Sequence, residues 1–317
     1  MDSIEFCAGA GGQALGLEQA GFRHSALVEI EQDFARSLTL NRPQWDVHAQ
    51  DMTLFDGRPY RGVDLFAAGL PCPPFSMAGK QLGEKDERNL FPAALRLIDE
   101  IQPRAVMIEN VRGFLSAVFE DYRLALKEQL RKLGYVVEWR LLNASHFGVP
   151  QLRPRVVIVA VRAEYSDRFD WPVPLLSKPP TVGATLHDLM DANGWLGADR
   201  WAKNANDIAP TIVGGSKKHG GPDLGPTRAR AAWASLGVNG KSLAEVAPER
   251  DFVGMPRLTI PMVARIQGFP DDWHFHGRKT TAYRQVGNAF PPPVAKAVAT
   301  QLHAALSSRR LTSVRAA

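Results

Sequence analysis

The chain has 317 residues, of which 45% are hydrophobic, and a formal net charge of +5. A chain of this length can bury a sizeable core, and it contains no apolar run long enough to span a membrane. The start of the chain lacks the basic and apolar segments of an export signal, so a cytoplasmic protein is expected. Two cysteines, Cys7 and Cys72, are too few for a disulfide framework and do not form a zinc motif, so no metal is expected. The positive charge is compatible with a polyanionic partner such as nucleic acid.

Short β-branched or aromatic runs alternate with amphipathic segments along the first half of the chain. The spacing predicts strands over 3–7, 25–30, 64–68, 105–109, 135–142 and 156–162, with helices over 13–20, 32–41, 91–101 and 122–133. This alternation is typical of an α/β fold, in which helices cover both faces of an open, mostly parallel sheet.

Prolines change the texture of the sequence after Asp170. Residues 171–174 and 178–180 have the composition of a linker, and regular alternation then fades until about Met255. A helix is expected from Arg257 to Phe269, and an apolar helix over 294–306 is expected to return to the first domain. The sequence therefore predicts domains over 1–170 and 171–275, with 276–317 completing the first.

Glycines follow the first predicted strand and open the first predicted helix, at Gly9, Gly11 and Gly12. Glycines at this point let a ligand approach the backbone and the helix N-terminus. Glu29, about twenty residues on, can accept hydrogen bonds from ribose hydroxyls, and Asp51 can recognise an adenine edge. An ordinary glycine turn, an NAD-type site and another adenosine cofactor remain open on this pattern alone.

Cys72 follows the predicted strand over 64–68, within the proline-rich turn from Gly69 to Ser76. Strand ends in α/β sheets carry the chemistry of such folds, and cysteine is a strong nucleophile at neutral pH. A small apolar filler is the alternative for a lone cysteine.

Charged side chains accompany the cysteine at two other strand ends. Glu109 ends the strand over 105–109, on the same sheet edge as Cys72. Alternation in an extended segment points Gln151, Arg153 and Arg155 to one side, where two guanidiniums can orient the carboxylate of Glu109. Taken singly, these residues also fit a capping acid and surface charges.

Together, these segments resemble the family of cytosine-5 DNA methyltransferases, which use S-adenosyl-L-methionine. The matching segments run in the family's order and comprise 6–12, Glu29, Asp51, 69–76, 109–111, 151–155, 257–259, 265–270 and 285–292. The resemblance covers nearly all of the chain outside 171–255. It implies a Rossmann-like methyltransferase sheet with a smaller, irregular target-recognition domain.

The resemblance implies a role for each matching residue. Cys72 adds to cytosine C6, which makes C5 nucleophilic, while Glu109 acts at N3, Arg155 holds O2 and Arg153 supports them. The cofactor-binding residues implied are Phe6, Cys7, Ala8, Gly9, Gly11, Gly12, Glu29, Ile30, Asp51, Met52, Gly69, Pro71, Leu90, Asn288 and Ala289.

Methylation at C5 requires the base to be flipped out of duplex DNA, and so requires a closing loop. The polar, glycine-spaced segment 73–89 is expected to be that loop, and the variable region is expected to read the DNA sequence. The DNA-binding candidates are Ser76, Lys80, Gln81, Lys217, Lys218, Arg228 and Arg230, where phosphate contacts and base contacts are equally expected.

Three positions depart from the family pattern. Pro73 stands where glutamine usually follows the nucleophile, which removes a side-chain contact and an amide N–H. Cys7 stands where many members stack phenylalanine on adenine, so Cys7 is expected to be structural, with Ile30 supplying part of the cofactor packing. Ala289 stands where serine is common, which removes one hydroxyl contact to the cofactor.

Two other activities were weighed against DNA methylation. A tRNA cytosine-5 methyltransferase shares the motifs, but the long variable region favours DNA. An NAD-dependent oxidoreductase fits the glycine loop but leaves Cys72 and Glu109 unexplained. A monomer acting on double-stranded DNA is expected, with a cognate restriction endonuclease as a candidate partner.

Overall fold

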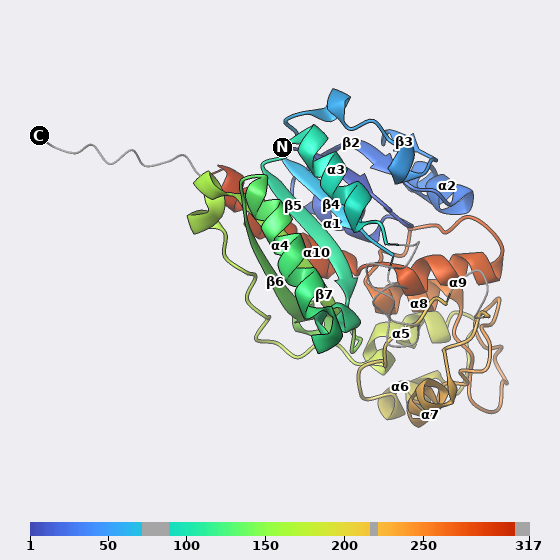
Figure 1. Ribbon diagram of the computed structural model, residues 1–317. Coiled ribbons are helices and arrows are strands. Elements are labelled where there is room, and N and C mark those ends of the chain that lie inside the picture. Colours follow the sequence, from blue (N-terminus) through green and yellow to red (C-terminus); the bar gives the residue numbers. More distant parts are fainter. Residues whose placement is uncertain (72–88, 216–220, 308–317) are drawn as a thin grey trace, which may run out of the picture.

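A computed structural model describes residues 1–71, 89–215 and 221–307 (Figure 1). Seven strands form one sheet: β1 (Asp2–Phe6), β2 (Arg23–Val28), β3 (Val47–His48), β4 (Leu65–Gly69), β5 (Ala105–Val111), β6 (Tyr135–Asn143) and β7 (Pro154–Arg162). Their spatial order is β3-β2-β1-β4-β5-β7-β6, and β7 runs antiparallel to both of its neighbours. The mostly parallel α/β sheet predicted from the sequence is confirmed.

The helices of the described residues are α1 (Gly12–Gln19), α2 (Gln32–Asn41), α3 (Phe91–Ile101), α4 (Glu120–Lys132), α5 (Val182–Met190), α6 (Ala198–Asn204), α7 (Thr227–Ser235), α8 (Ile260–Gln267), α9 (Lys279–Asn288) and α10 (Pro292–Ser307). Helices α2 and α3 have the predicted bounds, and α1, α4 and α10 differ from prediction by one or two residues at each end. Helix α8 begins later than expected, because Thr259 is its N-cap and accepts a hydrogen bond from the Met262 backbone N–H.

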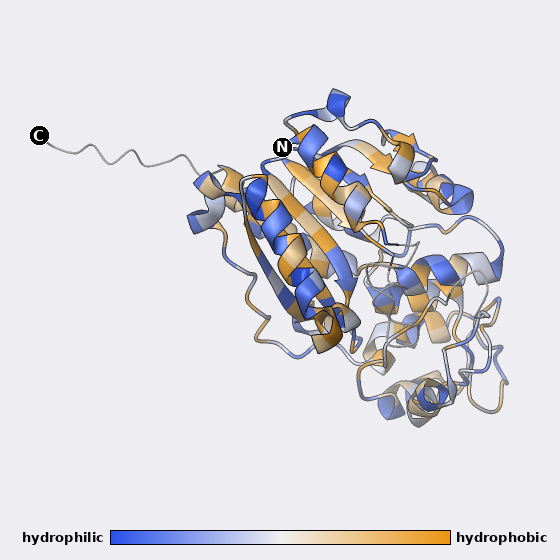
Figure 2. Ribbon diagram, viewed as in Figure 1, coloured by the Kyte–Doolittle hydropathy of each residue, from blue (hydrophilic) through white to orange (hydrophobic). Residues whose placement is uncertain are grey.

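The central strands are buried on both faces, and their residues are correspondingly apolar. In β4, the residues from Leu65 to Ala68 are fully buried, whereas the edge strand β6 alternates buried and exposed positions along much of its length. Helices α3 and α4 pack on one face of the sheet, and α1 and α10 pack on the other. Figure 2 shows hydrophobic residues concentrated in the strands and hydrophilic residues on the outward side of α4.

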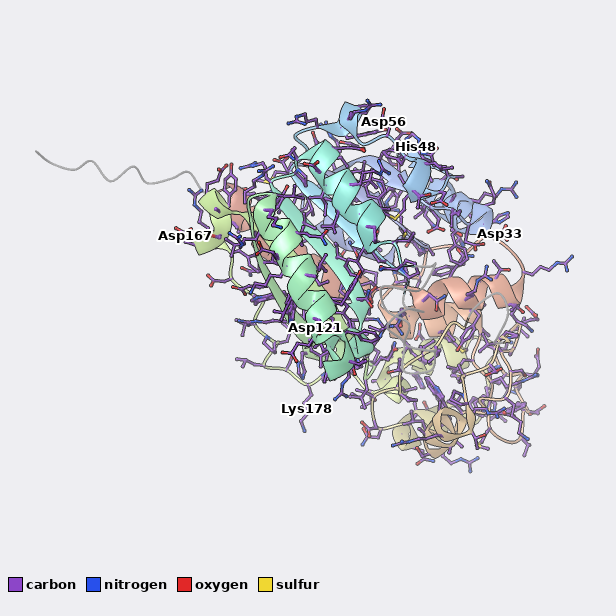
Figure 3. The ribbon with its side chains drawn as sticks, in the orientation of Figure 1. Asp33, His48, Asp56, Asp121, Asp167 and Lys178 are labelled. Atoms are coloured by element: carbon purple, nitrogen blue, oxygen red, sulfur yellow. The ribbon has the colours of Figure 1, made fainter. Side chains whose placement is uncertain are left out.

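A third apolar core joins the sheet region to the irregular region. It combines Leu15 of α1, Leu38 of α2 and Trp45 with Trp201, Trp233 and other residues of the later region. Asp33 of α2, labelled in Figure 3, is hydrogen-bonded to His276, with Oδ1 3.1 Å from Nδ1. Residues on both sides of the predicted boundary at 170/171 therefore share one core.

Candidate functional site

The chain leaves β1 through a loop whose backbone is largely left-handed. Cys7, Gly9 and Gly11 have φ angles of 52°, 58° and 87°. Glycine adopts such angles without steric cost, so Gly9 and Gly11 allow the sharp path from β1 into α1. The loop is fixed by hydrogen bonds from Ala8 N to Val28 O at 3.2 Å and from Gly11 N to Ala8 O at 3.0 Å.

Glu29 holds this loop to the end of β2. Its Oε2 accepts a hydrogen bond from Gly9 N at 2.7 Å, and its Oε1 accepts one from Glu31 N at 2.8 Å. Burial raises the pKa of the Glu29 carboxyl, and the backbone N–H donors oppose that shift. Each oxygen keeps a second acceptor position, which suits ribose hydroxyls, and the neighbouring Ile30 side chain is 59% exposed. The cluster therefore fits the adenosine cofactor expected from the sequence.

The other expected adenosine contacts lie beside the start of the loop. The Asp51 carboxylate is half-buried and accepts a hydrogen bond from Thr53 N at 2.8 Å. Met52 is buried, with its Sδ 3.5 Å from Cys7 Sγ. Burial, followed by the charges of Glu29, Asp51 and Glu5, raises the pKa of the Cys7 thiol. A thiol kept neutral in this way supports the structural role expected for Cys7.

The remaining candidate cofactor residues differ in how far they are exposed to solvent. Phe6 is fully buried, and its ring packs between Phe55 and Phe66. Asn288 is exposed, the half-buried residues are Gly69, Pro71 and Leu90, and the buried ones are Ala8, Gly12 and Ala289.

Glu109 and Arg155 form what we call the catalytic corner. Arg155 Nε lies 2.7 Å from Glu109 Oε1, and the two side chains are 13% and 7% exposed. The antiparallel pairing of β5 with β7 creates this contact by placing Val111 opposite Arg155. Burial raises the pKa of Glu109, while the charges of Arg155 and then Arg153 act to lower it.

The parallel register of β4 and β5 brings the corner next to the predicted nucleophile loop. Gly69 pairs with Glu109, so the chain passes Glu109 two residues before Pro71. Cys72 lies outside the described residues.

Arg153, which was expected to lie near Glu109 in support, binds backbone carbonyls of distant segments. Its side chain is fully buried and donates to Ile212 O at 2.6 Å, Gly287 O at 2.7 Å and Ala289 O at 2.9 Å. Strand β7 begins only at Pro154, so the strict alternation assumed for 151–155 does not apply. The charge of Arg153 nevertheless acts to lower the pKa of Glu109.

Two glutamines extend this arrangement into what we call the seam, which consists of Gln151, Arg153, Ile212, Gln267 and the 287–289 segment. Gln151 Oε1 accepts from Ile212 N at 2.9 Å, and Gln151 Nε2 donates to Gln267 Oε1 at 2.7 Å. Gln267 Nε2 in turn donates to Ala289 O at 2.6 Å. The seam is a closed hydrogen-bond network that ties the irregular region to the main body.

Close backbone packing reinforces the seam beside the candidate cofactor residues. A Cβ on Gly287 would lie 2.4 Å from Gly214 N, so α9 and the 213–215 segment touch backbone to backbone. Asn288 Nδ2 also donates to Gly215 O at 3.3 Å. Sequence reasoning identified Asn288 and Ala289 but missed the roles of Ile212, Gly214 and Gln267, whose contacts are distant along the chain.

Two of the predicted DNA-binding residues can be located. Arg228 is exposed and Arg230 half-buried on α7, which lies on the side of the irregular region away from the sheet (Figure 1). These two arginines do not lie at the catalytic corner. The other candidates, Ser76, Lys80, Gln81, Lys217 and Lys218, lie outside the described residues.

Within residues 1–71, 89–215 and 221–307, no group of three or more His, Cys, Asp or Glu side chains is arranged to hold a metal ion. Across the same ranges, no helix is both long enough and apolar enough to cross a lipid bilayer.

Comparison with known proteins adds three sequence similarities. The family model described as C-5 cytosine-specific DNA methylase matches residues 1–304. The chain is 54% identical over 313 residues to Type II methyltransferase M.NaeI of Lentzea aerocolonigenes, covering 97% of this chain and 76% of that protein. It is also 54% identical over 307 residues to Type II methyltransferase M.NgoMIV of Neisseria gonorrhoeae, covering 96% and 97%.

Solved structures are similar in fold at lower sequence identity. An E. coli prophage protein described as a DNA modification methyltransferase gives a TM-score of 0.68 at 23% identity, covering 97% of this chain and 100% of that one. A DNMT2 variant of Spodoptera frugiperda gives a TM-score of 0.65 at 19% identity, covering 95% and 99%.

Proposed function

Because this chain belongs to the C-5 cytosine-specific DNA methylase family, we propose that Cys72, Glu109 and Arg155 carry out the reaction of that family. The chain is a DNA (cytosine-5-)-methyltransferase that uses S-adenosyl-L-methionine. The observation that carries the assignment of residues is the Glu109–Arg155 ion pair of 2.7 Å, set beside the end of β4 that leads to Cys72.

The glycine loop and its neighbours are assigned to the cofactor. Glu29 would hold the ribose hydroxyls, Asp51 would bind the adenine edge, and Ile30 would pack on an adenine face. Asn288 and Ala289 would lie at the other end of the cofactor. S-adenosyl-L-methionine supplies an electrophilic methyl group on sulfur. The second acceptor positions of Glu29 and the exposure of Ile30 support this assignment.

Cys72 is assigned the first covalent step. Its thiolate forms a bond to C6 of a flipped cytosine, and the electrons of the C5–C6 double bond make C5 nucleophilic. Glu109 is assigned to donate a proton to N3, and burial supports this role because it raises the pKa of the carboxyl. Arg155 then stabilises the carboxylate that remains on Glu109. After C5 accepts the methyl group, the C5 proton leaves to a base or water, the C5–C6 double bond re-forms, the Cys72 thiolate is expelled, and N3 returns its proton to Glu109.

The cellular role follows from the relatives named above. Both are Type II methyltransferases, and we assign the same class to this chain, with double-stranded DNA as substrate and a cognate restriction endonuclease as partner. We expect it to act in the cytoplasm as a monomer, because one flipped base needs one active site. The three-part division at 170/171 and 275/276 is retained as a proposal, in which the middle part selects the sequence.

Bisulfite sequencing of duplex DNA incubated with the protein and S-adenosyl-L-methionine tests the proposal. We expect 5-methylcytosine at one short sequence context with wild-type protein and none with Cys72→Ser. Absence of modified cytosine in every context would refute the proposal, and labelling of RNA alone would favour the tRNA methyltransferase alternative. Cleavage of the methylated DNA by the cognate endonuclease would contradict the Type II assignment.

A further inference from the structure

The adenosine end of the proposed cofactor site rests on a segment with little regular structure of its own. Asp51 caps the short 3-10 turn Met52–Leu54 through Thr53 N. Met52 connects this turn to the glycine loop, since its Sδ contacts Cys7 Sγ at 3.5 Å. Any shift of the turn would therefore move Asp51 and Met52 relative to the glycine loop.

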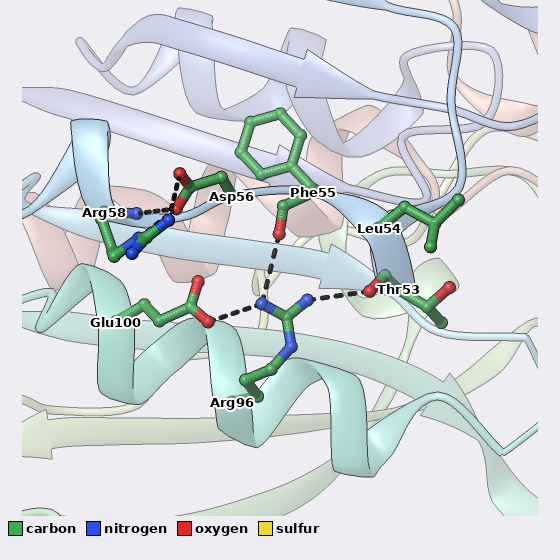
Figure 4. Close-up of a pocket in the computed structure, with 7 residues that line it drawn as sticks. All are labelled: Thr53, Leu54, Phe55, Asp56, Arg58, Arg96 and Glu100. Carbon is green, nitrogen blue, oxygen red and sulfur yellow. Dashed lines mark hydrogen bonds and ion pairs between the residues drawn. The ribbon is translucent and has the colours of Figure 1, made fainter.

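Arg96 of α3 holds this turn by its backbone carbonyls. Its Nη2 donates to Met52 O at 3.3 Å. The same Nη2 donates to Thr53 O at 3.2 Å, and Nη1 donates to Phe55 O at 3.2 Å (Figure 4). These carbonyls belong to a turn and its exit, where few backbone partners are available. One planar guanidinium thus spans the turn and its exit, a geometry that lysine cannot reproduce fully.

Glu100, one helical turn after Arg96, completes the support. Its Oε1 accepts from Arg96 Nη1 at 2.6 Å, and its Oε2 accepts from Gly57 N at 2.9 Å. The two side chains of α3 therefore fix the 52–57 segment at both ends. Figure 4 shows Arg96 lying between Glu100 and the carbonyls that it binds.

Arg96 and Glu100 line a surface cleft that also contains Arg58. Two arginines in one cleft are a candidate site for an anion. Arg58 is engaged by Asp56 through two bonds, from Nε at 2.8 Å and from Nη2 at 2.9 Å. Arg96 forms an ion pair with Glu100. Both cations that line the cleft are neutralised, so its chemistry supports a fixed turn rather than an anionic ligand.

We propose that Arg96, oriented by Glu100, is a positioning residue that fixes Asp51 and Met52 and thereby sets the affinity for the adenosine part of S-adenosyl-L-methionine. The inference rests on the proposed assignment of Asp51 and Met52 to the cofactor site. Arg96 acts through the turn and touches no reacting atom. Its loss weakens cofactor binding and leaves the chemical step at saturating cofactor unchanged.

The test compares Arg96→Met, Arg96→Lys and the control Arg58→Met. Arg58 lines the same cleft but binds Asp56 and none of the turn carbonyls that Arg96 holds. Calorimetry measures the Kd for S-adenosylhomocysteine and for 5′-methylthioadenosine, which keeps adenine and ribose but lacks the amino-acid end. We expect Arg96→Met to raise both Kd values about tenfold, equivalent to about 1.4 kcal/mol. Arg96→Lys should recover part of the loss, and Arg58→Met should match wild type.

Steady-state kinetics supply the second readout. The KM for S-adenosyl-L-methionine should rise with the Kd in Arg96→Met, while kcat stays within about twofold of wild type, as expected for lost ground-state binding. Unchanged Kd values, or a fall in kcat without a change in Kd, would overturn the inference. If Arg96→Met does not fold, Glu100→Gln replaces it. An unchanged Kd in that variant would also overturn the inference. Failure of wild-type protein to bind S-adenosylhomocysteine would instead overturn the cofactor site itself.

Discussion

The catalytic corner and the seam each receive one arginine from the same short segment, and the two arginines have different partners. Arg155 faces a carboxylate whose pKa burial has raised, whereas Arg153 faces backbone carbonyls from three other positions. An arginine paired with a titratable group acts directly on its proton transfer, whereas one bound to carbonyls mainly holds them in place and reaches the titratable group only through its charge. The bonding partner of each arginine, rather than its residue type or its place in the motif, therefore distinguishes a catalytic role from a structural one.

The position of α9 explains why the seam needs a cation. Gly287 lies in the last turn of α9, and Ala289 follows directly, so their carbonyls lack partners within the helix. The negative end of the helix dipole also favours a positive charge there. Arg153, which is buried, supplies both the hydrogen-bond donors and the positive charge at this end of the helix.

Glu109→Gln tests the chemical side of the comparison and should have the largest effect. The amide keeps the shape of the side chain but cannot transfer an acidic proton to N3, so the single-turnover rate of methyl transfer should fall about 10²–10⁴-fold. The Kd for S-adenosylhomocysteine should stay within about twofold of wild type, because Glu109 lies outside the proposed cofactor residues. A rate within about threefold of wild type would remove Glu109 from the reaction.

Matched Arg153→Met and Arg155→Met variants test the comparison directly. Arg153→Met leaves the carbonyls of Ile212 and Gly287 without this donor, and each buried unpaired carbonyl costs about 1–3 kcal/mol. We expect its free energy of unfolding, measured in urea, to fall by about 2–5 kcal/mol.

Arg155→Met should lose less stability and more rate, because Arg155 pairs with the carboxyl assigned to the reaction, whereas Arg153 holds buried carbonyls. Removing the arginine also removes the largest influence that lowers the pKa of Glu109, so the alkaline limb of the pH–rate profile should move to higher pH. Equal losses of stability in the two variants would contradict the division between corner and seam.

Glu5 offers a smaller test, since this buried carboxyl of β1 belongs to neither region. Neither carboxyl oxygen has a hydrogen-bond partner among the described residues, and burial followed by the charge of Glu29 raises its pKa well above the usual value of 4.5. As pH rises from 4.5 toward the folded-state pKa, the unfolded chain loses this proton first, so stability should fall.

Each pKa unit of this difference lowers the free energy of unfolding by about 1.4 kcal/mol above the folded-state pKa. Glu5→Gln should flatten that slope, as urea unfolding at pH 5 and pH 8 would measure. A wild-type slope retained in the variant would show that Glu5 does not titrate as described.

The sequence predicted the sheet region well for a physical reason. Buried parallel strands are continuous apolar runs, and the helices between them repeat apolar residues at helical spacing. Strand β3 was missed because it has only two residues, and α9 because its sequence from Lys279 to Asn288 lacks that spacing. The antiparallel direction of β7 had a usable signal, because the connection over 144–153 is too short for a crossover helix.

The candidate site divides along the same line. Glu109 and Arg155 were predicted to meet because one lies near the end and the other at the start of a strand that the apolar pattern reveals. Three carbonyls that Arg153 binds lie 59, 134 and 136 residues away, and backbone atoms leave no mark in the sequence. Arg96 had a weak signal in its i, i+4 pairing with Glu100, but its carbonyl contacts had none.

The central claim is that Cys72 attacks C6 of cytosine with the catalytic corner assisting. Duplex DNA containing 5-fluorocytosine tests it most directly, because fluorine at C5 cannot leave as the proton does and the covalent adduct is trapped. Mass spectrometry should find wild-type protein linked to DNA through Cys72 in the presence of S-adenosyl-L-methionine, greatly slowed linkage in Glu109→Gln, and none in Cys72→Ser. An adduct formed by Cys72→Ser, or one mapped to Cys7, would contradict the account.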